Sequence, residues 1–237
     1  MSDLYSGRVV LVTGASRGVG RLIVDHFLAA GARVIGVARG DSELVHERYR
    51  HFAADVADPA AVQSLFASLR LEVGNVDIVI NNAAVLTSQY SMIMPASAAQ
   101  AMVNVNLLAP FLVSREAAKL MRKGKWGRII NIGSMAASLE PEGDSVYAAC
   151  KAALSVLAGV MAKEFASMNV TCNTLGITAI ETDMLRQLPR DKINGVIAGL
   201  PIPRYATPDD ILNVIDFFAS ARSSYITAQT VFLGGVH

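Results

Sequence analysis

The chain has 237 residues, of which 52% are hydrophobic and 17% are charged. Its 21 basic residues nearly balance its 20 acidic ones, which argues against a global field that would recruit nucleic acid or an anionic membrane. No uninterrupted apolar run approaches the roughly 18 to 20 residues that span a bilayer. We therefore expect the apolar excess to be buried inside the protein.

The first residues show neither the cationic region nor the apolar region of a secretory signal. The two cysteines, Cys150 and Cys172, are too few for a disulfide framework, and the four histidines do not cluster with them. We therefore expect free thiols, no bound metal and a cytoplasmic location.

Short apolar runs alternate with helical patterns along the chain. The expected elements, in chain order, are a strand at 9–13, a helix at 19–30, strands at 33–38 and 51–53, a helix opened by Asp58 and Pro59, a strand at 76–81, a helix at 97–123, a strand at 128–133, a helix at 145–167, a strand at 170–175, a helix opened by Thr207 and Pro208, and a strand at 229–233. Seven weakly charged strands separated by helices predict an α/β fold, with one doubly wound parallel sheet covered by helices on both faces.

No linker or composition shift divides the chain, so residues 1–237 are expected to form a single domain. The stretch 177–206, rich in proline and glycine, interrupts the alternation before the last helix. We interpret residues 184–205 of it as a flap beside a functional site.

A glycine-rich turn follows the first strand, with the sequence Thr13-Gly14-Ala15-Ser16-Arg17-Gly18-Val19-Gly20. Glycines let the backbone turn tightly and approach a pyrophosphate, whose charge the following helix N-terminus would receive. The spacing differs from the usual Gly-x-Gly-x-x-Gly, and a turn that only packs the strand on the helix remains the alternative. Its place between a strand and a helix favours the dinucleotide site.

Further motifs follow in order: Asp55-Val56, Asn81-Asn82-Ala83-Ala84, Asn106-Leu107, Ser134, and Tyr147-Ala148-Ala149-Cys150-Lys151. With the glycine turn, they resemble the short-chain dehydrogenase/reductase family over essentially the whole chain. The segments 132–134, 180–184 and 225–227 resemble its 3-oxoacyl-acyl-carrier-protein reductase branch in particular. The resemblance implies a Rossmann-type fold and a nicotinamide cofactor.

Tyr147 and Lys151 are four residues apart, so a helix places both on one face. An ammonium there can favour the phenolate and lower the tyrosine pKa from about 10. We assign Tyr147 as the proton donor to a carbonyl oxygen. The resemblance implies that Lys151 also binds the nicotinamide ribose.

Two polar residues complete the expected catalytic set. Ser134 would donate a hydrogen bond to the substrate oxygen as charge develops, unless it only caps the turn after its strand. Asn106 resembles the asparagine that holds a water in a proton relay toward the lysine. The alternatives are that Asn106 bonds only to backbone, as buried asparagines do, or that Asn104 is the residue concerned.

NADPH is expected rather than NAD because Ala38 stands where NAD-dependent relatives have an aspartate. Arg39 and Arg17 would contact a 2′-phosphate, whereas in the alternative Arg39 is solvated and Asp41 binds the ribose. The expected cofactor-binding residues are Gly14, Ser16, Arg17, Gly18, Val19, Gly20, Arg39, Asp55, Val56, Asn82, Ala83, Ala84, Tyr147, Lys151 and Thr182.

Three positions depart from the family pattern and suggest a specialised member. Ile177-Thr178 stands where Pro-Gly is usual, which leaves the backbone path beside the nicotinamide open. Ala84 replaces a glycine and adopts positive φ less freely. Leu233 stands where aspartate is common.

The expected function is the NADPH-dependent reduction of a ketone, a 3-oxoacyl thioester or a related specialised-pathway ketone, to a secondary alcohol. One alternative is an alcohol or sterol dehydrogenase working oxidatively, and another is a non-catalytic scaffold that binds the cofactor. The apolar flap favours a hydrophobic acyl or cyclic ketone.

Partners are also suggested by the sequence. The basic run from Lys119 to Arg128 could dock an acidic carrier protein, although cations also complement the end of an ordinary helix. The helices 97–123 and 145–167 are apolar on more than one face. The family resemblance implies that they pair across subunits, so we expect a homotetramer or at least a dimer.

Overall fold

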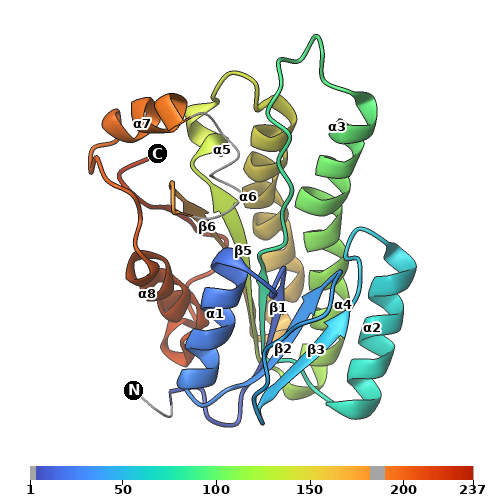
Figure 1. The fold of residues 1–237 in the computed structure, drawn as a ribbon. Coiled ribbons are helices and arrows are strands. Elements are labelled where there is room, and N and C mark those ends of the chain that lie inside the picture. The colour runs from blue at the N-terminus through green and yellow to red at the C-terminus, as the bar shows by residue number, and fades with distance from the viewer. Residues whose placement is uncertain (1–3, 182–189, 237) are drawn as a thin grey trace.

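The structure, a computed structural model, describes residues 4–181 and 190–236. Its seven strands form one parallel sheet in the order β3-β2-β1-β4-β5-β6-β7 (Figure 1). The strands are β1 (Val9–Thr13), β2 (Arg33–Ala38), β3 (Tyr49–Ala53), β4 (Ile78–Asn81), β5 (Gly127–Ser134), β6 (Val170–Ile177) and β7 (Thr230–Phe232). The predicted doubly wound sheet is confirmed.

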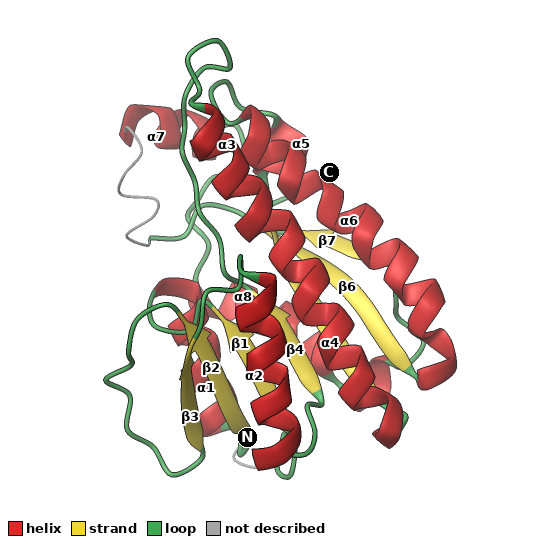
Figure 2. Ribbon diagram, turned by 90° about the vertical axis from the view of Figure 1, so that its right-hand side faces the viewer, coloured by secondary structure: helices red, strands yellow, loops and turns green. Residues whose placement is uncertain are grey.

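Helices cover both faces of this sheet. They are α1 (Gly18–Ala29), α2 (Pro59–Glu72), α3 (Ala96–Val103), the π-helical turn η1 (Asn104–Leu108), α4 (Ala109–Gly124), α5 (Ala136–Leu139), α6 (Ser145–Phe165), η2 (Ala166–Met168), α7 (Arg190–Ala198), α8 (Pro208–Ala219) and η4 (Ala221–Ser223). Figure 2 shows α2, α4 and α6 in front of the sheet and α1 and α8 behind it.

Alternate residues of each strand supply the two cores. Leu11 and Ile35 pack under α2 and α4, whereas Val10, Val12 and Val34 pack under α1 and α8. The helical segments 96–124 and 145–168 have the length and hydropathy of membrane spans. Their buried apolar residues pack on the sheet, but only 33% and 39% of the most apolar stretch of each segment is buried within this chain.

Two helix starts form as their sequences predict. The Asp58 carboxylate accepts a hydrogen bond from the Ala60 N–H at 2.9 Å, with Pro59 in the first turn. Thr207 and Asp210 form a reciprocal capping box at the start of α8. Both caps satisfy backbone donors that a helix N-terminus otherwise leaves without partners.

We predicted an irregular stretch at residues 177–206. This stretch contains the helix α7. Ile193 and Ile197 on one side of α7 are buried against Ala179, which follows β6. The Ala206 N–H donates to the Ala179 carbonyl at 2.8 Å, so the end of the stretch is fastened beside the sheet. The first residues of the predicted flap, 184–189, lie outside the described residues.

The predicted helix 97–123 is continuous, but it passes through the π-helical turn η1. Asn106 lies fully buried in this turn. Its Oδ1 accepts from the Val85 N–H at 3.0 Å, and its Nδ2 donates to the Val85 carbonyl at 2.8 Å. Asn106 therefore clamps the chain just after β4 to the helix. Single π-turns occur frequently at functional sites.

The prediction that Arg128 belongs to an exposed basic run is wrong. Arg128 is fully buried, its guanidinium lies 4.4 Å from the centre of the Trp126 ring, and it donates to the Gly127 and Ser220 carbonyls. Lys119 is paired with Glu116 at 2.7 Å. The contact with Ser220 joins residues distant in sequence and makes Arg128 part of the packed interior.

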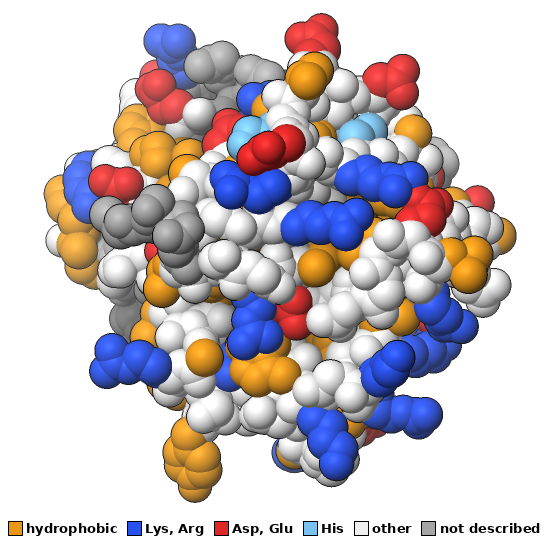
Figure 3. All heavy atoms as spheres, turned by 90° about the horizontal axis from the view of Figure 1, so that it is seen from below, with side chains coloured by type: hydrophobic (Ala, Val, Ile, Leu, Met, Phe, Trp, Pro, Cys, Tyr) orange, Lys and Arg blue, Asp and Glu red, His pale blue; other side chains and the backbone are white. Residues whose placement is uncertain are grey.

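The rest of the run lies at the end of the sheet where the strands begin. It precedes β5, whose eight residues separate it from Ser134 by roughly 25 Å. Figure 3 views the end where the strands begin, and its basic side chains are spread among acidic and neutral ones. No contact of the described residues bears on carrier docking at this run, which stays a prediction.

Candidate active site

The candidate site lies at the carboxyl ends of the central strands. The strand order reverses between β1 and β4, which are neighbours in the sheet although β2 and β3 come between them in the chain. In open parallel sheets, ligands bind in the crevice outside such a switch point. The glycine turn follows β1, and Ser134 ends β5 at the same edge.

The glycine turn is held by contacts that only glycine permits. A Cβ at position 20 would lie 2.1 Å from the Gly14 carbonyl oxygen and 2.6 Å from Asn82 Nδ2. Gly14 has a φ of 67°, in the left-handed region. Asn82 Nδ2 donates to the Thr13 carbonyl at 2.9 Å, which ties the turn to the end of β4. The turn is thus built into the sheet edge.

The helix after this turn begins without a side-chain cap. Arg17 occupies the N-cap position and makes no capping hydrogen bond, and Ser16 and Gly18 beside it are exposed. The first N–H groups of α1 therefore face outward with the positive end of the helix dipole. This arrangement fits an anion such as the pyrophosphate of a dinucleotide.

The end of β2 lies against the same turn. The Gly14 N–H donates to the Val37 carbonyl at 2.8 Å, which brings Arg39 to the edge that carries Arg17. Both arginines are exposed, and neither guanidinium has a partner in the part of the chain that the structure describes. Asp55 follows β3, where its carboxylate accepts from the Ala57 N–H, and Val56 beside it is buried.

Three of the four predicted catalytic residues meet at β5 and α6. Ser134 ends β5, and its Oγ accepts from the Ala136 N–H at 3.1 Å, so it does cap the following turn. It also forms a hydrogen bond with Tyr147, which is buried. Burial raises the pKa of Tyr147 to about 12; the Ser134 hydrogen bond lowers this pKa and the Asp144 charge raises it.

Lys151 is buried one turn farther along α6. Its Nζ donates to the Ile132 carbonyl of β5 at 2.7 Å and lies 5.8 Å from the centre of the Tyr147 ring. Burial lowers the pKa of Lys151 to about 8. The ammonium is thus held in a dry site by one backbone oxygen.

We predicted that Lys151 lowers the pKa of Tyr147. For the protein without cofactor this prediction is wrong. That pKa is raised because burial outweighs the Ser134 hydrogen bond. Lys151 points to Ile132 and does not donate to the phenol oxygen. The sequence spacing placed both residues on one face correctly, but it could not show where the ammonium points.

The two asparagines differ in burial and in their hydrogen bonds. Asn106 is fully buried, whereas Asn104 is partly exposed and accepts from Gln100 Nε2 at 2.8 Å. The described hydrogen bonds of the Asn106 side chain go to the backbone of Val85 alone. Its side chain thus positions the helix and the loop after β4.

Comparison with known proteins agrees with this geometry. The family described as short chain dehydrogenase matches residues 8–193. The chain belongs to the short-chain dehydrogenase family. It is therefore an oxidoreductase of a family that binds nicotinamide cofactors.

Relatives match nearly the whole chain. It is 35% identical to the 3-oxoacyl-[acyl-carrier-protein] reductase FabG of Escherichia coli and to that of Salmonella typhimurium, over 98% of this chain and 97% of each relative. Among solved structures, the ligand-free aldohexose dehydrogenase of Thermoplasma acidophilum matches with a TM-score of 0.90 and 28% identity, over 99% of this chain and 95% of that one.

The departures from the family pattern are accommodated locally. Ile177 continues β6 and pairs with Ser134, and its carbonyl accepts from the Met135 N–H at 2.8 Å. Ala84 does not occur among the non-glycine residues with positive φ, so it needs no glycine. Thr182, predicted to bind the cofactor, lies outside the described residues.

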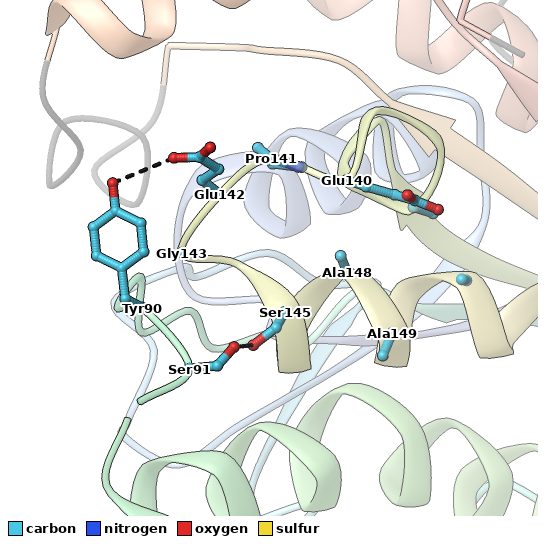
Figure 4. Close-up of a pocket in the computed structure, with 11 residues that line it drawn as sticks. Tyr90, Ser91, Glu140, Pro141, Glu142, Gly143, Ser145, Ala148 and Ala149 are labelled. Atoms are coloured by element: carbon cyan, nitrogen blue, oxygen red, sulfur yellow. Dashed lines mark hydrogen bonds between the residues drawn. The ribbon is translucent and has the colours of Figure 1, made fainter. Parts of the chain in front are cut away.

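A pocket of about 630 Å³ opens on the outer side of this site. Figure 4 shows it between the turn at Tyr90, the loop at Glu142 and the start of α6. Its lining residues Ser145 and Ala149 lie on the exposed side of α6, away from Lys151. It therefore borders the catalytic group without containing it.

Sequence reasoning missed one polar group at the site. Asp144, three residues before Tyr147, is 6% exposed, and its Oδ1 has no hydrogen-bond partner. The signal was available, since residues three apart at a helix start share a face. An aspartate at a helix start is ordinarily a cap, so the pattern alone does not mark it as part of a site.

Replacing Lys151 with Met should stabilise the protein without cofactor. Burial lowers the Lys151 pKa from 10.5 to about 8, which corresponds to roughly 3 kcal/mol of folding free energy lost by burying the charge. Substitution also removes the hydrogen bond to Ile132, which offsets about 1 kcal/mol of the expected gain in stability. We expect Lys151→Met to unfold with about 2 kcal/mol more free energy at pH 7 in urea titrations.

The stability difference between Lys151→Met and the wild type should depend on pH. Between about pH 8 and pH 10.5 the unfolded chain still binds the Lys151 proton and the folded chain does not, so wild-type stability rises across this window. The advantage of Lys151→Met should therefore be full below pH 8 and shrink toward pH 10.5. An advantage independent of pH would contradict the buried-charge assignment.

Proposed function

We propose that the protein reduces a ketone to a secondary alcohol with NADPH, and that the ketone is a 3-oxoacyl thioester or a close relative of one. The observation that carries the proposal is the convergence of Ser134, Tyr147 and Lys151 in a dry site at the switch-point edge. The relatives named 3-oxoacyl-[acyl-carrier-protein] reductase support the substrate class, free or carried on an acyl carrier protein.

Each side chain has a role that follows from its surroundings. The cofactor, when bound, supplies the hydride. Ser134 donates a hydrogen bond to the substrate oxygen as negative charge develops on it. Tyr147, whose pKa is raised to about 12, holds its proton near neutral pH and gives it to that oxygen. Lys151 holds the cofactor ribose, and Asn106 keeps the helix and the loop after β4 in place.

Reduction suits this site because a tyrosine that keeps its proton is a donor. Oxidation of an alcohol would need the phenolate, which burial disfavours here. A second candidate is nevertheless the oxidation of a hydroxylated substrate, favoured by the likeness to an aldohexose dehydrogenase. Turnover in each direction, with each class of substrate, distinguishes the two.

The cofactor site that we propose covers the glycine turn and the strand ends around it. Its residues are Gly14, Ser16, Arg17, Gly18, Val19, Gly20, Arg39, Asp55, Val56, Asn82, Ala83, Ala84, Tyr147, Lys151 and Thr182. The uncapped start of α1 supports a pyrophosphate there. The free guanidiniums of Arg17 and Arg39 support a 2′-phosphate, hence NADPH.

Tyr147→Phe should lower kcat for NADPH-dependent reduction of a short 3-oxoacyl thioester by at least about 100-fold, since it removes the proton donor. NADPH binding, followed by fluorescence, should remain. Tyr225→Phe is the control, because Tyr225 is fully exposed. Full activity in Tyr147→Phe, or no turnover in the wild type, would defeat the proposed reaction.

Arg39→Ala should raise KM for NADPH by about 10- to 100-fold and leave KM for NADH within about twofold, because it removes a charge-assisted contact to the 2′-phosphate alone. Arg33→Ala is the matched control, since Arg33 is an exposed arginine at the opposite end of β2. Equal effects on both cofactors would show that Asp41 or another group reads the ribose.

We also propose that residues 1–237 act as one cytoplasmic domain and assemble as a homotetramer or dimer. The support is an apolar surface on the outer faces of η1, α4 and α6, formed by Leu108, Phe111, Val156 and Val160, which are 37%, 37%, 69% and 49% exposed. Burying such residues between subunits would stabilise an assembly.

Val156→Glu should therefore reduce the mass that light scattering reports at micromolar concentration. Val45→Glu is the control, because Val45 is 95% exposed in the loop after β2. A wild-type monomer, or equal masses in both variants and the wild type, would contradict this interface.

A further inference from the structure

Asp144 is a nearly buried carboxylate that no part of the proposed reaction uses. It lies at the N-cap position of α6, is 6% exposed, and forms no side-chain cap bond with its own helix. Its Oδ1 is fully enclosed and has no hydrogen-bond partner in the structure. The usual reason for an aspartate at a helix start is therefore absent.

An enclosed oxygen without a donor is unfavourable in a folded protein. Buried polar groups are almost always hydrogen-bonded, and a carboxylate loses more than a neutral group when it is not. The fold could avoid this cost with an apolar side chain or with the ordinary cap. The presence of an unpaired carboxylate at this position therefore points to a hydrogen-bond donor on a bound ligand.

The position of Asp144 places that donor beside the reacting group. Asp144 precedes Tyr147 by three residues on the same side of α6, and the two side chains interact electrostatically. A ligand group that reaches the carboxylate through Oδ2, the oxygen that is not enclosed, therefore lies close to Tyr147. The ketone substrate of the proposed function is the molecule that comes there.

The nearby charges favour a hydroxyl over an ammonium as the donor. Lys151 already places a buried cation on the same helix face, 5.8 Å from the Tyr147 ring centre. A second cation on the substrate would be repelled in a site of low dielectric. A hydroxyl donates a hydrogen bond to a carboxylate without adding charge.

We propose that Asp144 is a specificity-determining residue that accepts a hydrogen bond from a substrate hydroxyl close to the ketone. The proposal rests on the proposed function and narrows its substrate class to hydroxylated ketones. Among residues 4–181 and 190–236, none donates a hydrogen bond to Oδ1 of this carboxylate, and the substrate hydroxyl would supply the carboxylate with a donor.

The test compares two thioesters that differ in one hydroxyl. They are the N-acetylcysteamine thioesters of 3-oxobutanoate and of 4-hydroxy-3-oxobutanoate, each reduced with NADPH. kcat and KM are measured for the wild type, Asp144→Asn and Asp144→Leu. Glu140→Gln is the control, because Glu140 is an exposed carboxylate in the loop before α6.

The wild type and Glu140→Gln should prefer the hydroxylated ketone by about 10- to 100-fold in kcat/KM, mainly through KM. Asp144→Leu should lose this preference while its kcat/KM for the plain ketone stays within about threefold of the wild type. Asp144→Asn should keep a part of the preference. Melting temperatures verify folding, and Asp144→Leu should melt no lower because it removes an unpaired buried group.

Each result bears on a different claim. If the wild type reduces both thioesters equally, or if Asp144→Leu keeps the preference, the Asp144 proposal is overturned and the proposed function stands. If both thioesters lose activity alike in the variants, Asp144 is only structural and the proposal is overturned as well. If the wild type reduces neither, the proposed function fails. Titration of the two thioesters into the NADPH-saturated protein then tests Asp144 separately, and equal affinities overturn its role.

Discussion

The hydrogen bond from the Lys151 ammonium to the Ile132 carbonyl is the contact on which the site depends. It crosses from α6 to β5 in a buried region and fixes the helix face that carries Tyr147. One acceptor does not satisfy an ammonium, which has three donors. Burial lowers the pKa of Lys151 to about 8. The ribose hydroxyls of a nicotinamide cofactor would supply further acceptors to the ammonium.

Polar groups that lack hydrogen-bond partners among the described residues also occur at three places along the edge of the sheet that carries the site. The start of α1 has no side-chain cap, the guanidiniums of Arg17 and Arg39 have no partners among the described residues, and the Asp144 carboxylate has no donor. The proposed ligands would supply the missing partners. The pyrophosphate and 2′-phosphate of the dinucleotide would meet the start of α1 and the two guanidiniums, and a hydroxyl of the ketone would meet the carboxylate. Rigid contacts such as Asn82 to Thr13 and Asn106 to Val85 hold these groups in place.

Much of this could be predicted from the sequence because local signals agreed with the global fold. Apolar runs gave the seven strands, Asp58 with Pro59 marked a helix start, and ordered motifs led to Ser134, Tyr147 and Lys151. Other features depend on contacts between residues far apart in sequence. Arg128 has the pattern of a surface cation, but the fold brings the carbonyl of Ser220 to its guanidinium in the protein interior. The π-turn at Asn106 has no distinct periodicity, and α7 was hidden by the prolines and glycines around it.

The most direct test of this account is an NMR titration of the Lys151 ε-methylene in the protein with and without NADPH. The account predicts a pKa of about 8 in the cofactor-free protein, where one carbonyl holds a buried ammonium. It predicts a higher pKa with NADPH, because new acceptors favour the charged form. A cofactor-free pKa near the ordinary 10.5, or a pKa that NADPH leaves unchanged, would contradict it.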